Sequence, residues 1–327
     1  MDYNDFLNYL ISHLNDYFKD SATIACHKIL KNNDVYYDAL MARSDTSNIS
    51  ATIYVNRYFE QYGKGRHINE ILKEIKEIFE KNINQKIDLS YLSDFSNLES
   101  QIAIKLINYE SNAKLLSLVP HILFHDLALV FYIIINTPPF TNSTVLIHNY
   151  HLDKWQINID VLYHAARKNT PSLLGYEIID MDDIIKEFMI QDIKESIYSK
   201  RYWADYIINN ELISRFADDV LRDLNDYIPK KTIFVLTGKN RTNGACFIIY
   251  PEILERFAAN WGCDIYILPS SIHEVILIPA TLSPSASELG EMVREINKTE
   301  VAPTERLSDN VYLYSFADKA VNLVTEG

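Results

Sequence analysis

The sequence predicts an α+β protein in which short antiparallel sheets carry helices packed on one face. Short apolar segments alternate with amphipathic segments and turn residues along the chain, most clearly in its last third. The chain has 327 residues, more than one hydrophobic core usually organises, so we expect several modules. Hydrophobic residues make up 48% of the chain and charged residues 23%, which is the balance of a folded protein rather than a disordered one.

Residues 1–117 are expected to form an N-terminal α+β module with a helical tail. Apolar residues recur at three- and four-residue steps in both predicted helices and in the tail. The first two strands flank Lys31-Asn-Asn-Asp34, a turn rich in residues that tolerate left-handed backbone. In chain order, the predicted elements are a helix, a hairpin, a third strand, a second helix and the helical tail: residues 6–18, 23–30 with 35–42, 49–55, 68–79 and 93–118.

Residues 118–229 are expected to form a middle β-β-α module followed by an acidic helical connector. The continuous apolar run Leu127–Ile135 is typical of a strand covered on both faces. The elements that follow are a short strand, a helix and the two helices of the connector: residues 144–147, 152–168 and 181–227. Asn169-Thr-Pro171 is expected to end the helix of this module, because proline is unfavourable inside helices.

Residues 230–327 are expected to form a C-terminal ββαββαβ module. Pro251 stands where the first turn of a helix tolerates proline, and Gly262 stands where a helix ends. Ser287 is expected to cap the last helix, because the acidic Glu288 follows it and favours the positive end of a helix. The predicted elements are a hairpin, a helix, a second hairpin and a helix before the last strand: residues 233–237 with 245–250, 251–261, 265–268 with 273–278, and 287–298.

Three segments share a plan in which a short apolar strand turns directly into a helix that begins with aromatic residues: 52–62, 144–155 and 245–257. One interpretation is a threefold repeat of a strand–helix unit. The alternative is that strand-to-helix joints are common and resemble one another in composition. The fold class does not depend on which interpretation holds.

The formal net charge of −13, the length of the apolar runs and the cysteines together indicate the expected partners and location. Affinity for nucleic-acid phosphates comes mainly from clustered lysine and arginine, so nucleic-acid binding is not expected. The longest apolar run, Leu127–Ile135, is far shorter than the roughly 20 residues that cross a bilayer, so no membrane association is expected. The acidic start, Met1-Asp-Tyr-Asn-Asp5, and three cysteines without pair spacing suit a cytoplasmic protein.

Segments spread through nearly the whole chain carry a resemblance to a known family: Ile49-Ser-Ala-Thr-Ile-Tyr-Val-Asn56, Lys105-Leu-Ile-Asn-Tyr109, Val119-Pro-His121, Asp126-Leu-Ala-Leu-Val-Phe-Tyr132, Asn169-Thr-Pro171, Leu268-Pro-Ser-Ser-Ile-His-Glu-Val-Ile276, Glu300-Val-Ala-Pro303 and Leu307-Ser-Asp-Asn-Val-Tyr312. The family that the chain resembles consists of bacterial proteins from anaerobic Gram-positive bacteria and is described as a domain of unknown function. The resemblance implies a full-length, intracellular relative with the same fold. It implies no activity, because the family brings no assigned catalytic residue.

Two loops of the chain contain a pair of glycines, and neither matches a phosphate-binding motif. Gly63-Lys-Gly65 lacks the third glycine of a dinucleotide fingerprint, and the loop from Gly238 to Gly244 lacks the Gly-Lys-Ser/Thr ending of a P-loop. Phosphate loops need glycines at these positions because the backbone must approach the phosphates closely. We therefore expect no cofactor.

Two histidines and a carboxylate are the candidate metal ligands: His121, His125 and Asp126. On a helix, the Cβ atoms of residues four apart would lie about 5–6 Å from each other, close enough to share a zinc ion. The residue after His121 is isoleucine, so the glutamate base of the zinc-protease motif is missing. Histidines that are hydrogen-bonded within the fold are the simpler interpretation, and we expect no metal.

The candidate catalytic residues are Ser271, His273 and Glu274, in the segment from Ser270 to Glu274. On one strand, Ser271 and His273 would lie about 6.6 Å apart, beyond the roughly 2.6–3.2 Å that proton transfer needs. Glu274 would point to the opposite face. A hairpin turn, with His273 and Glu274 paired across strands, is the alternative and the favoured interpretation.

The leading functional hypothesis is a non-catalytic protein-binding or regulatory module. It depends on the absence of a specific catalytic motif, on the acidic charge and on the 22 tyrosines, a residue type that suits interfaces. A hydrolase that uses a His/Glu/Ser or metal site near residues 270–274 is one alternative, and a small-molecule sensor between modules is another. We expect a protein partner, and the sequence does not determine the oligomeric state.

Overall fold

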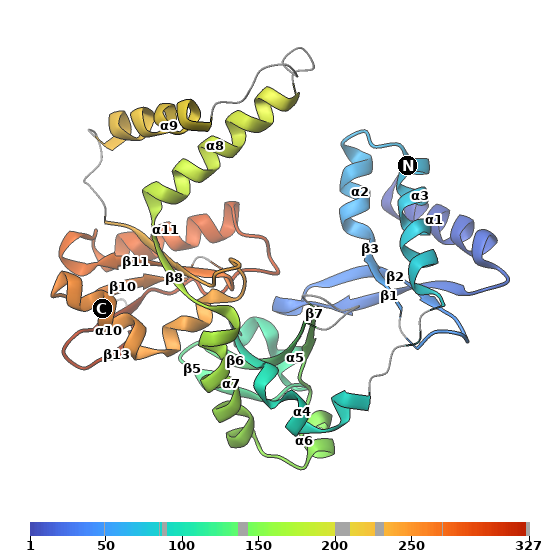
Figure 1. Cartoon of the computed structure of the whole chain (residues 1–327), viewed down its shortest axis with the longest axis horizontal. Coiled ribbons are helices and arrows are strands. Elements are labelled where there is room, and N and C mark those ends of the chain that lie inside the picture. The colour runs from blue at the N-terminus through green and yellow to red at the C-terminus, as the bar shows by residue number, and fades with distance from the viewer. Residues whose placement is uncertain are drawn as a thin grey trace. The chain divides into compact units, whose positions relative to one another are not determined.

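The computed structural model describes residues 1–48, 50–84, 86, 90–136, 143–199, 210–225, 232–269 and 271–324 (Figure 1). Short antiparallel sheets and helices make up the described chain, which confirms the predicted α+β class. Contacts divide the chain into two compact units. Unit 1 comprises Met1–Leu98, Ser111–Leu118 and Asp153–Gln156, and unit 2 comprises Glu99–Glu110, Val119–Leu152 and Ile157–Gly327.

The predicted division into three modules stays a prediction. Two pairs of strands cross its boundaries: β4 (Ile102–Asn108) pairs with β6 (Leu127–Ile135), and β8 (Glu177–Asp180) pairs with β9 (Phe234–Thr237). Among the described residues, no helix combines the length and the apolar composition needed to cross a bilayer.

Unit 1 contains a three-stranded antiparallel sheet in the order β1-β2-β3. Its elements are α1 (Tyr3–Phe18), β1 (Thr23–Leu30), β2 (Tyr36–Arg43), β3 (Thr52–Tyr54), α2 (Val55–Gly63), α3 (Ile68–Asn82), α4 (Phe95–Leu98) and α5 (Ala113–Leu116). The two predicted helices and the hairpin are confirmed, and Asn33 and Asp34 of the turn have the positive φ angles of 60° and 52° that their residue types tolerate. The third strand is confirmed in part, because β3 covers 52–54 and Ile49 lies outside the described residues.

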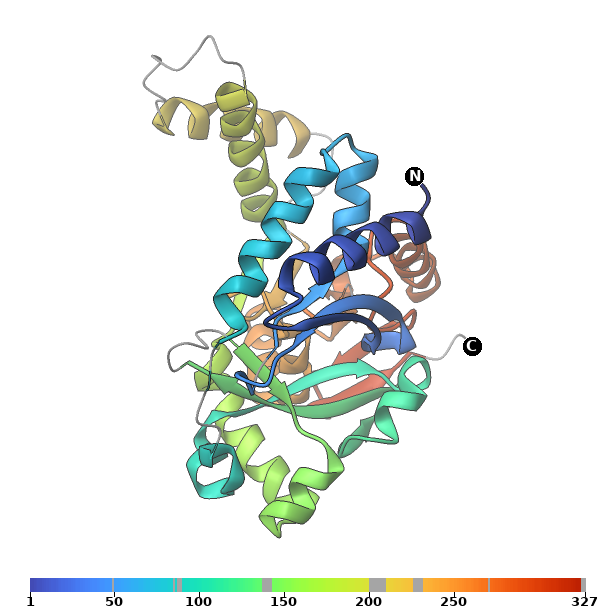
Figure 2. The ribbon, with the colours of Figure 1, turned by 90° about the vertical axis from the view of Figure 1, so that its right-hand side faces the viewer.

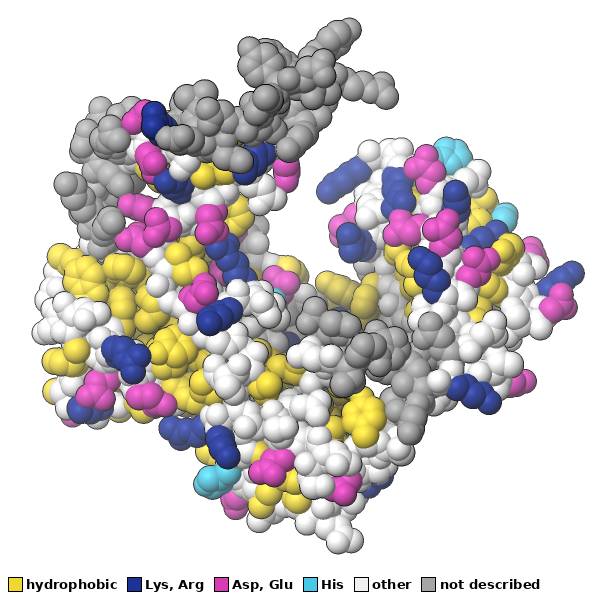
Figure 3. Space-filling model, in the orientation of Figure 1, with side chains coloured by type: hydrophobic (Ala, Val, Ile, Leu, Met, Phe, Trp, Pro, Cys, Tyr) yellow, Lys and Arg dark blue, Asp and Glu magenta, His cyan; other side chains and the backbone are white. Residues whose placement is uncertain are grey.

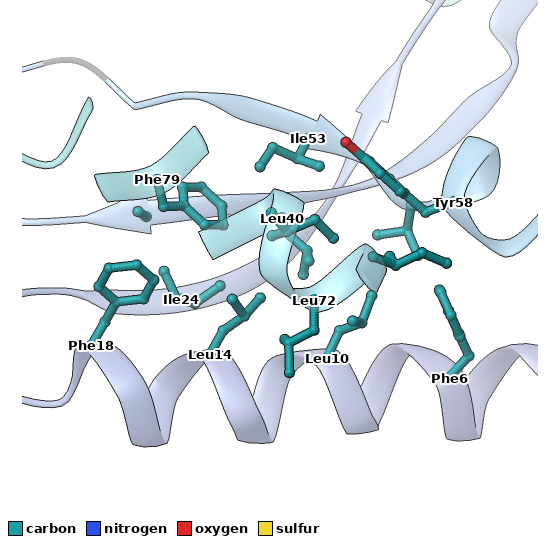
Figure 4. Close-up of a cluster of buried hydrophobic side chains, with 14 of the residues drawn as sticks. Phe6, Leu10, Leu14, Phe18, Ile24, Leu40, Ile53, Tyr58, Leu72 and Phe79 are labelled. Atoms are coloured by element: carbon teal, nitrogen blue, oxygen red, sulfur yellow. The ribbon is translucent and has the colours of Figure 1, made fainter. Parts of the chain in front are cut away.

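The core of unit 1 forms where one side of α1 meets the sheet (Figure 4). Phe6, Leu10, Leu14 and Phe18 recur at steps of four along α1, and all four are buried. They pack with side chains from the strands and from α3, namely Ile24, Leu40, Ile53, Leu72 and Phe79. Burying one such side chain contributes about 1.5–3 kcal/mol, so this apolar side largely determines how α1 is placed.

The prediction that residues 93–118 form one helix is wrong. The structure has two short helices there, α4 and α5, with strand β4 between them. β4 pairs along its whole length with β6, and Ile102, Ile104 and Leu106 are fully buried. A strand covered on both faces has no alternation of polar and apolar residues, so its pattern resembles that of a buried helix.

The first sheet of unit 2 has four strands: β4, β5 (His121–Phe124), β6 and β7 (Ser143–Leu146). β6 is the central strand and is almost entirely buried, which confirms the prediction for the apolar run. α6 (Asn149–Trp155) and α7 (Ile159–Leu174) follow, and α7 packs against β4.

The prediction that Asn169-Thr-Pro171 ends this helix is also wrong, because α7 continues through Pro171. Proline has no N–H, so the carbonyl of Arg167, four residues earlier, loses its helical partner. The hydroxyl of Tyr250 donates to that carbonyl at 2.9 Å. Thr170 is fully buried, and its hydroxyl donates to the carbonyl of Ala166 at 2.7 Å and accepts the N–H of Ile104 at 2.9 Å. Tertiary contacts therefore keep the helix intact.

The second sheet of unit 2 has six strands in the order β13-β12-β10-β11-β9-β8. Its remaining elements are α10 (Pro251–Trp261), β10 (Ile265–Leu268), β11 (Glu274–Pro279), α11 (Ala286–Thr299), β12 (Tyr312–Ser315) and β13 (Ala320–Leu323). The predicted helix 251–261 and the predicted hairpin of β10 with β11 are confirmed. Gly262 ends α10 with a φ of 63°. Ser285, rather than Ser287, caps α11, in a capping box with Glu288.

The predicted hairpin of 233–237 with 245–250 is wrong, because β9 pairs with β11 and β8. The second segment forms a 3₁₀ helix, η5 (Gly244–Ile249), whose residues are all buried. A Cβ on Gly244 would lie 2.1 Å from the backbone nitrogen of Gly238, so the chain turns here with two backbones in close contact. The third segment of the proposed strand–helix repeat therefore has no strand, whereas β3 leads into α2 and β7 is followed by α6.

The acidic connector consists of two helices in the described residues, α8 (Met181–Ser199) and α9 (Asn210–Asn225). We call this pair the arm. The two helices contact each other, and they lie side by side in both views (Figures 1 and 2). α8 begins directly after β8.

Replacing Gly244 tests the close backbone contact. We expect Gly244→Ala to lower the free energy of unfolding by about 2–3 kcal/mol, because the added Cβ meets backbone atoms that cannot rotate away. Gly63→Ala is the control, since its Cβ would have no atom within 4 Å. Denaturant unfolding of both variants measures the difference, and equal stabilities would contradict the contact.

Candidate functional site

Polar side chains from three distant segments of unit 2 meet around His273. Asn243 comes from the loop between β9 and η5, Ser271 and His273 come from the link between β10 and β11, and Glu305 comes from the segment between α11 and β12. We call these four residues the His273 cluster. Of the predicted catalytic residues, it contains Ser271 and His273, and Glu274 follows directly as the first residue of β11.

The backbone of His273 is held by several hydrogen bonds. Its N–H donates to the hydroxyl of Ser271 at 3.0 Å, and its carbonyl accepts from the Thr237 hydroxyl at 3.0 Å and from the Gly244 N–H at 2.8 Å. Ser271 is buried, and its own N–H donates to the carbonyl of Glu274 at 3.2 Å. Ser271 therefore closes a turn through main-chain contacts, which is the role expected in the favoured interpretation of this segment.

The imidazole of His273 lies between a backbone donor and a carboxylate. Nδ1 accepts the N–H of Asn243 at 3.2 Å, which assigns the proton of the neutral ring to Nε2. Nε2 lies 3.7 Å from a carboxylate oxygen of Glu305. A general base needs a free lone pair, and the one lone pair of this ring is already used. The geometry favours a positioning role for His273.

Burial and nearby charges set the protonation of this region. Burial lowers the pKa of His273, Glu305 opposes this shift, and Lys105 of β4 adds to it. The neutral ring is therefore the favoured form near neutral pH. Burial raises the pKa of Glu274, and the positive charge of Arg241 acts in the opposite direction. Glu274 pairs with Thr237 across β11 and β9, as expected of a cross-strand pair, whereas His273 lies just before the first residue of β11.

The structure places the metal candidates in a hairpin and not on a helix. His121 is the first residue of β5, whereas His125 and Asp126 form the two-residue turn to β6, with a φ of 56° at His125. Four residues of strand span about 13 Å, too far for His121 and His125 to share an ion. A ring nitrogen of each lies near a backbone carbonyl, Val119 for His121 at 3.1 Å and Val321 for His125 at 3.0 Å. The described residues contain no group of three histidine, cysteine or carboxylate side chains placed to hold a metal ion.

Asp126 accepts hydrogen bonds from three side chains near β12. The hydroxyls of Ser308 and Tyr312 each donate at 2.5 Å, and the amide of Asn310 donates at 3.0 Å. Tyr312 is fully buried, and burial together with the charge of Asp126 raises its pKa, so it stays a donor. We call these four residues the Asp126 clamp. It joins the β5–β6 hairpin to the segment that leads into β12.

Sequence reasoning missed most members of both groups. The partners of Asp126 lie 182 to 186 residues away, and no local pattern relates them. Asn243 and Glu305 were likewise missed, although the Asn243-Gly244 pair was a usable signal. Such a pair favours positive φ, and Asn243 has a φ of 54°.

These observations define an α+β protein in which polar residues from distant segments of unit 2 meet. The chain belongs to a family of unknown function (DUF5688), whose model matches residues 3–315. This confirms the full-length resemblance inferred from the sequence. No curated protein and no solved structure matches the chain.

Removing the carboxylate of Asp126 tests the clamp. Asp126→Ala should lower the free energy of unfolding by about 2–4 kcal/mol, because three donors lose a charged acceptor. Asp192→Ala, at an exposed position of α8, should change it by no more than about 0.5 kcal/mol. Denaturant unfolding provides the measurement. An Asp126→Ala variant with the same free energy of unfolding as the wild type would refute the clamp.

The lowered pKa of His273 predicts a pH dependence of stability. Below the ordinary histidine pKa of about 6.5, the unfolded chain binds more protons than the folded one. Stability from this residue is therefore complete above that pH and is lost as the pH falls toward the folded pKa. His273→Asn cannot titrate and should flatten this slope, whereas His164→Asn, at an exposed position of α7, should keep it. Thermal unfolding between about pH 5 and pH 7 measures the slopes.

Proposed function

We propose that this chain is a non-catalytic protein-binding module and that its docking surface lies on the arm. One observation carries the proposal: α8 is apolar on two sides, and α9 covers one of them. An apolar side of a helix is normally covered, since exposed apolar surface favours association.

The contacts with α9 identify the covered side of α8. The α9 residues Ile213, Ala217 and Leu221 recur at steps of four and are 8%, 0% and 8% exposed. Lys186 of α8 contacts a carboxylate oxygen of Asp218 of α9 at 2.5 Å. The side of α8 that carries Lys186 therefore faces α9.

The second side of α8 carries four apolar residues, Met181, Ile184, Ile185 and Phe188. Their spacing of three, four and seven residues places them in one stripe, which we call the apolar stripe. Phe188 follows Lys186 by two residues and so lies about 200° around the helix from it, directly away from α9. Ile185 is 39% exposed and Phe188 is 57% exposed.

The charge around the apolar stripe indicates the chemistry of the partner. Asp192 and Glu195 follow Phe188 at four and seven residues and continue the stripe, and both are exposed. In the part of the arm that is described, acidic, basic and apolar side chains lie beside one another (Figure 3). A second copy of this chain would bring the same carboxylates and a net charge of −13, so self-association is disfavoured. The fitting partner is a basic amphipathic helix of another protein, docked by its apolar face.

The proposal includes a location in the cytoplasm of an anaerobic Gram-positive bacterium. The origin depends on the family resemblance of the sequence. Cys26, Cys246 and Cys263 are free thiols, which is usual in a reducing compartment.

Binding of a defined probe tests the docking surface. A helical peptide of leucine and lysine, apolar on one face and basic on the other, should bind the full chain in fluorescence anisotropy. Phe188→Asp should weaken binding at least about tenfold, because it removes a large apolar contact and adds a buried charge. Tyr150→Asp is the matched control, because Tyr150 is an aromatic residue on another helix with 61% exposure, and this variant should bind as the wild type does.

A peptide with glutamate in place of lysine separates charge complementarity from general stickiness. It should bind far more weakly than the basic peptide, with the gap narrowing at high salt. Equal binding of both peptides, or equal loss in Phe188→Asp and Tyr150→Asp, would contradict the proposal.

A further inference from the structure

The loop of residues 238–244, between β9 and η5, contacts α8 through Arg241. The guanidinium of Arg241 forms an ion pair with the carboxylate of Glu187, which lies on α8 one residue before Phe188 of the apolar stripe. The loop itself is held to unit 2, since the N–H of Lys239 donates to the carbonyl of Leu174 at 3.2 Å. This loop is therefore a direct link between the arm and the sheet.

The other end of the loop is held by His273. The N–H of Asn243 donates to Nδ1 of the ring at 3.2 Å, and the N–H of Gly244 donates to the carbonyl of His273 at 2.8 Å. The side-chain amide of Asn243 also donates to the hydroxyl of Tyr132 at 3.2 Å. Arg241 and Asn243 have positive φ angles of 51° and 54°. Asparagine tolerates such an angle, whereas the angle at Arg241 is unfavourable for its side chain and needs supporting contacts.

We propose that His273 is a latch on this loop, and that protonation of its ring loosens the hold of the loop on the arm. The inference rests on the proposed function, because the arm is the docking surface whose placement the latch would regulate. A proton from solvent adds to Nδ1, and Nε2 keeps its own. Both nitrogens are then donors, so the ring no longer accepts the N–H of Asn243. One of the contacts that position Asn243 is lost, and Arg241 lies only two residues away.

The groups that face the ring set when the latch opens. Glu305, whose carboxylate lies 3.7 Å from Nε2, favours the charged ring. Lys105 of β4 and the burial of the ring favour the neutral form. Glu274 is the next residue in the chain, and Tyr132 reaches the site through Asn243. The latch is therefore closed near neutral pH and opens in mild acid, where the new positive charge gains Glu305 as its partner.

Hydrogen–deuterium exchange of the full chain tests the latch without any binding partner. Peptides that cover residues 238–244 and the first turns of α8 are compared at about pH 7.5 and about pH 5.5, after correction for intrinsic exchange. We expect protection in both segments to fall by about threefold to tenfold at the lower pH, the factor for one lost hydrogen bond. Unchanged protection would overturn the proposal.

Two variants separate the latch from general loosening. In His273→Asn the side-chain oxygen can accept the N–H of Asn243 but cannot titrate, so protection should be the same at both pH values. In Arg241→Gln the loop should keep its pH response while α8 loses protection at both pH values, because the link to Glu187 is removed. A His273→Asn variant that responds to pH as the wild type does would refute the latch.

The test also distinguishes the latch from the proposed function. Exchange in the unbound chain reports the latch whether or not the basic peptide binds. If the peptide fails to bind while exchange responds to pH, the docking proposal fails and the latch remains. If the peptide binds with the same affinity at both pH values and exchange is unchanged, the docking proposal remains and the latch fails.

Discussion

In unit 2, the carboxylate of Asp126 accepts three side-chain hydrogen bonds from segments that are distant in sequence. Asp126 lies in the tight turn between β5 and β6, and its donors lie beside or within β12, so one charged group connects both sheets of the unit. The amide of Asn108 adds a bond to the carbonyl of Leu307 at 3.0 Å, in the same region. Charge-assisted bonds of this kind are about twice as strong as neutral ones. The order of the segment before β12 follows from them.

The His273 cluster depends on this order. Glu305 lies just before the clamped residues, and its carbonyl accepts the N–H of Ile272 at 2.9 Å. That bond holds the link between β10 and β11 beside the segment from α11, so that the carboxylate of Glu305 reaches the ring of His273. The Asp126 clamp therefore helps to position the His273 cluster, although Asp126 and His273 are far apart in sequence. The protonation of the ring is a property of this packing and not of the local motif.

Sequence patterns were reliable where one face of an element is polar. α1, α3, α10 and the two confirmed hairpins have such a face, and hydrophobic periodicity identified them. The patterns failed at β4 and at η5, which are buried on all sides, so that periodicity carries no information about their type. The site was recognised only in part. Ser271, His273 and Glu274 are neighbours in sequence, but their partners are distant, and no single sequence shows which distant residues meet.

The proline inside α7 has a consequence for how this protein can vary. The hydroxyl of Tyr250 fills the place that a main-chain donor would otherwise occupy at the carbonyl of Arg167, so positions 171 and 250 share one acceptor. With alanine at position 171, a main-chain N–H could donate to the carbonyl of Arg167, and the hydroxyl of Tyr250 would no longer be needed there. With phenylalanine at position 250 and proline kept at 171, the carbonyl oxygen of Arg167 would have no hydrogen-bond donor. Among descendants of this sequence, the two positions should change together.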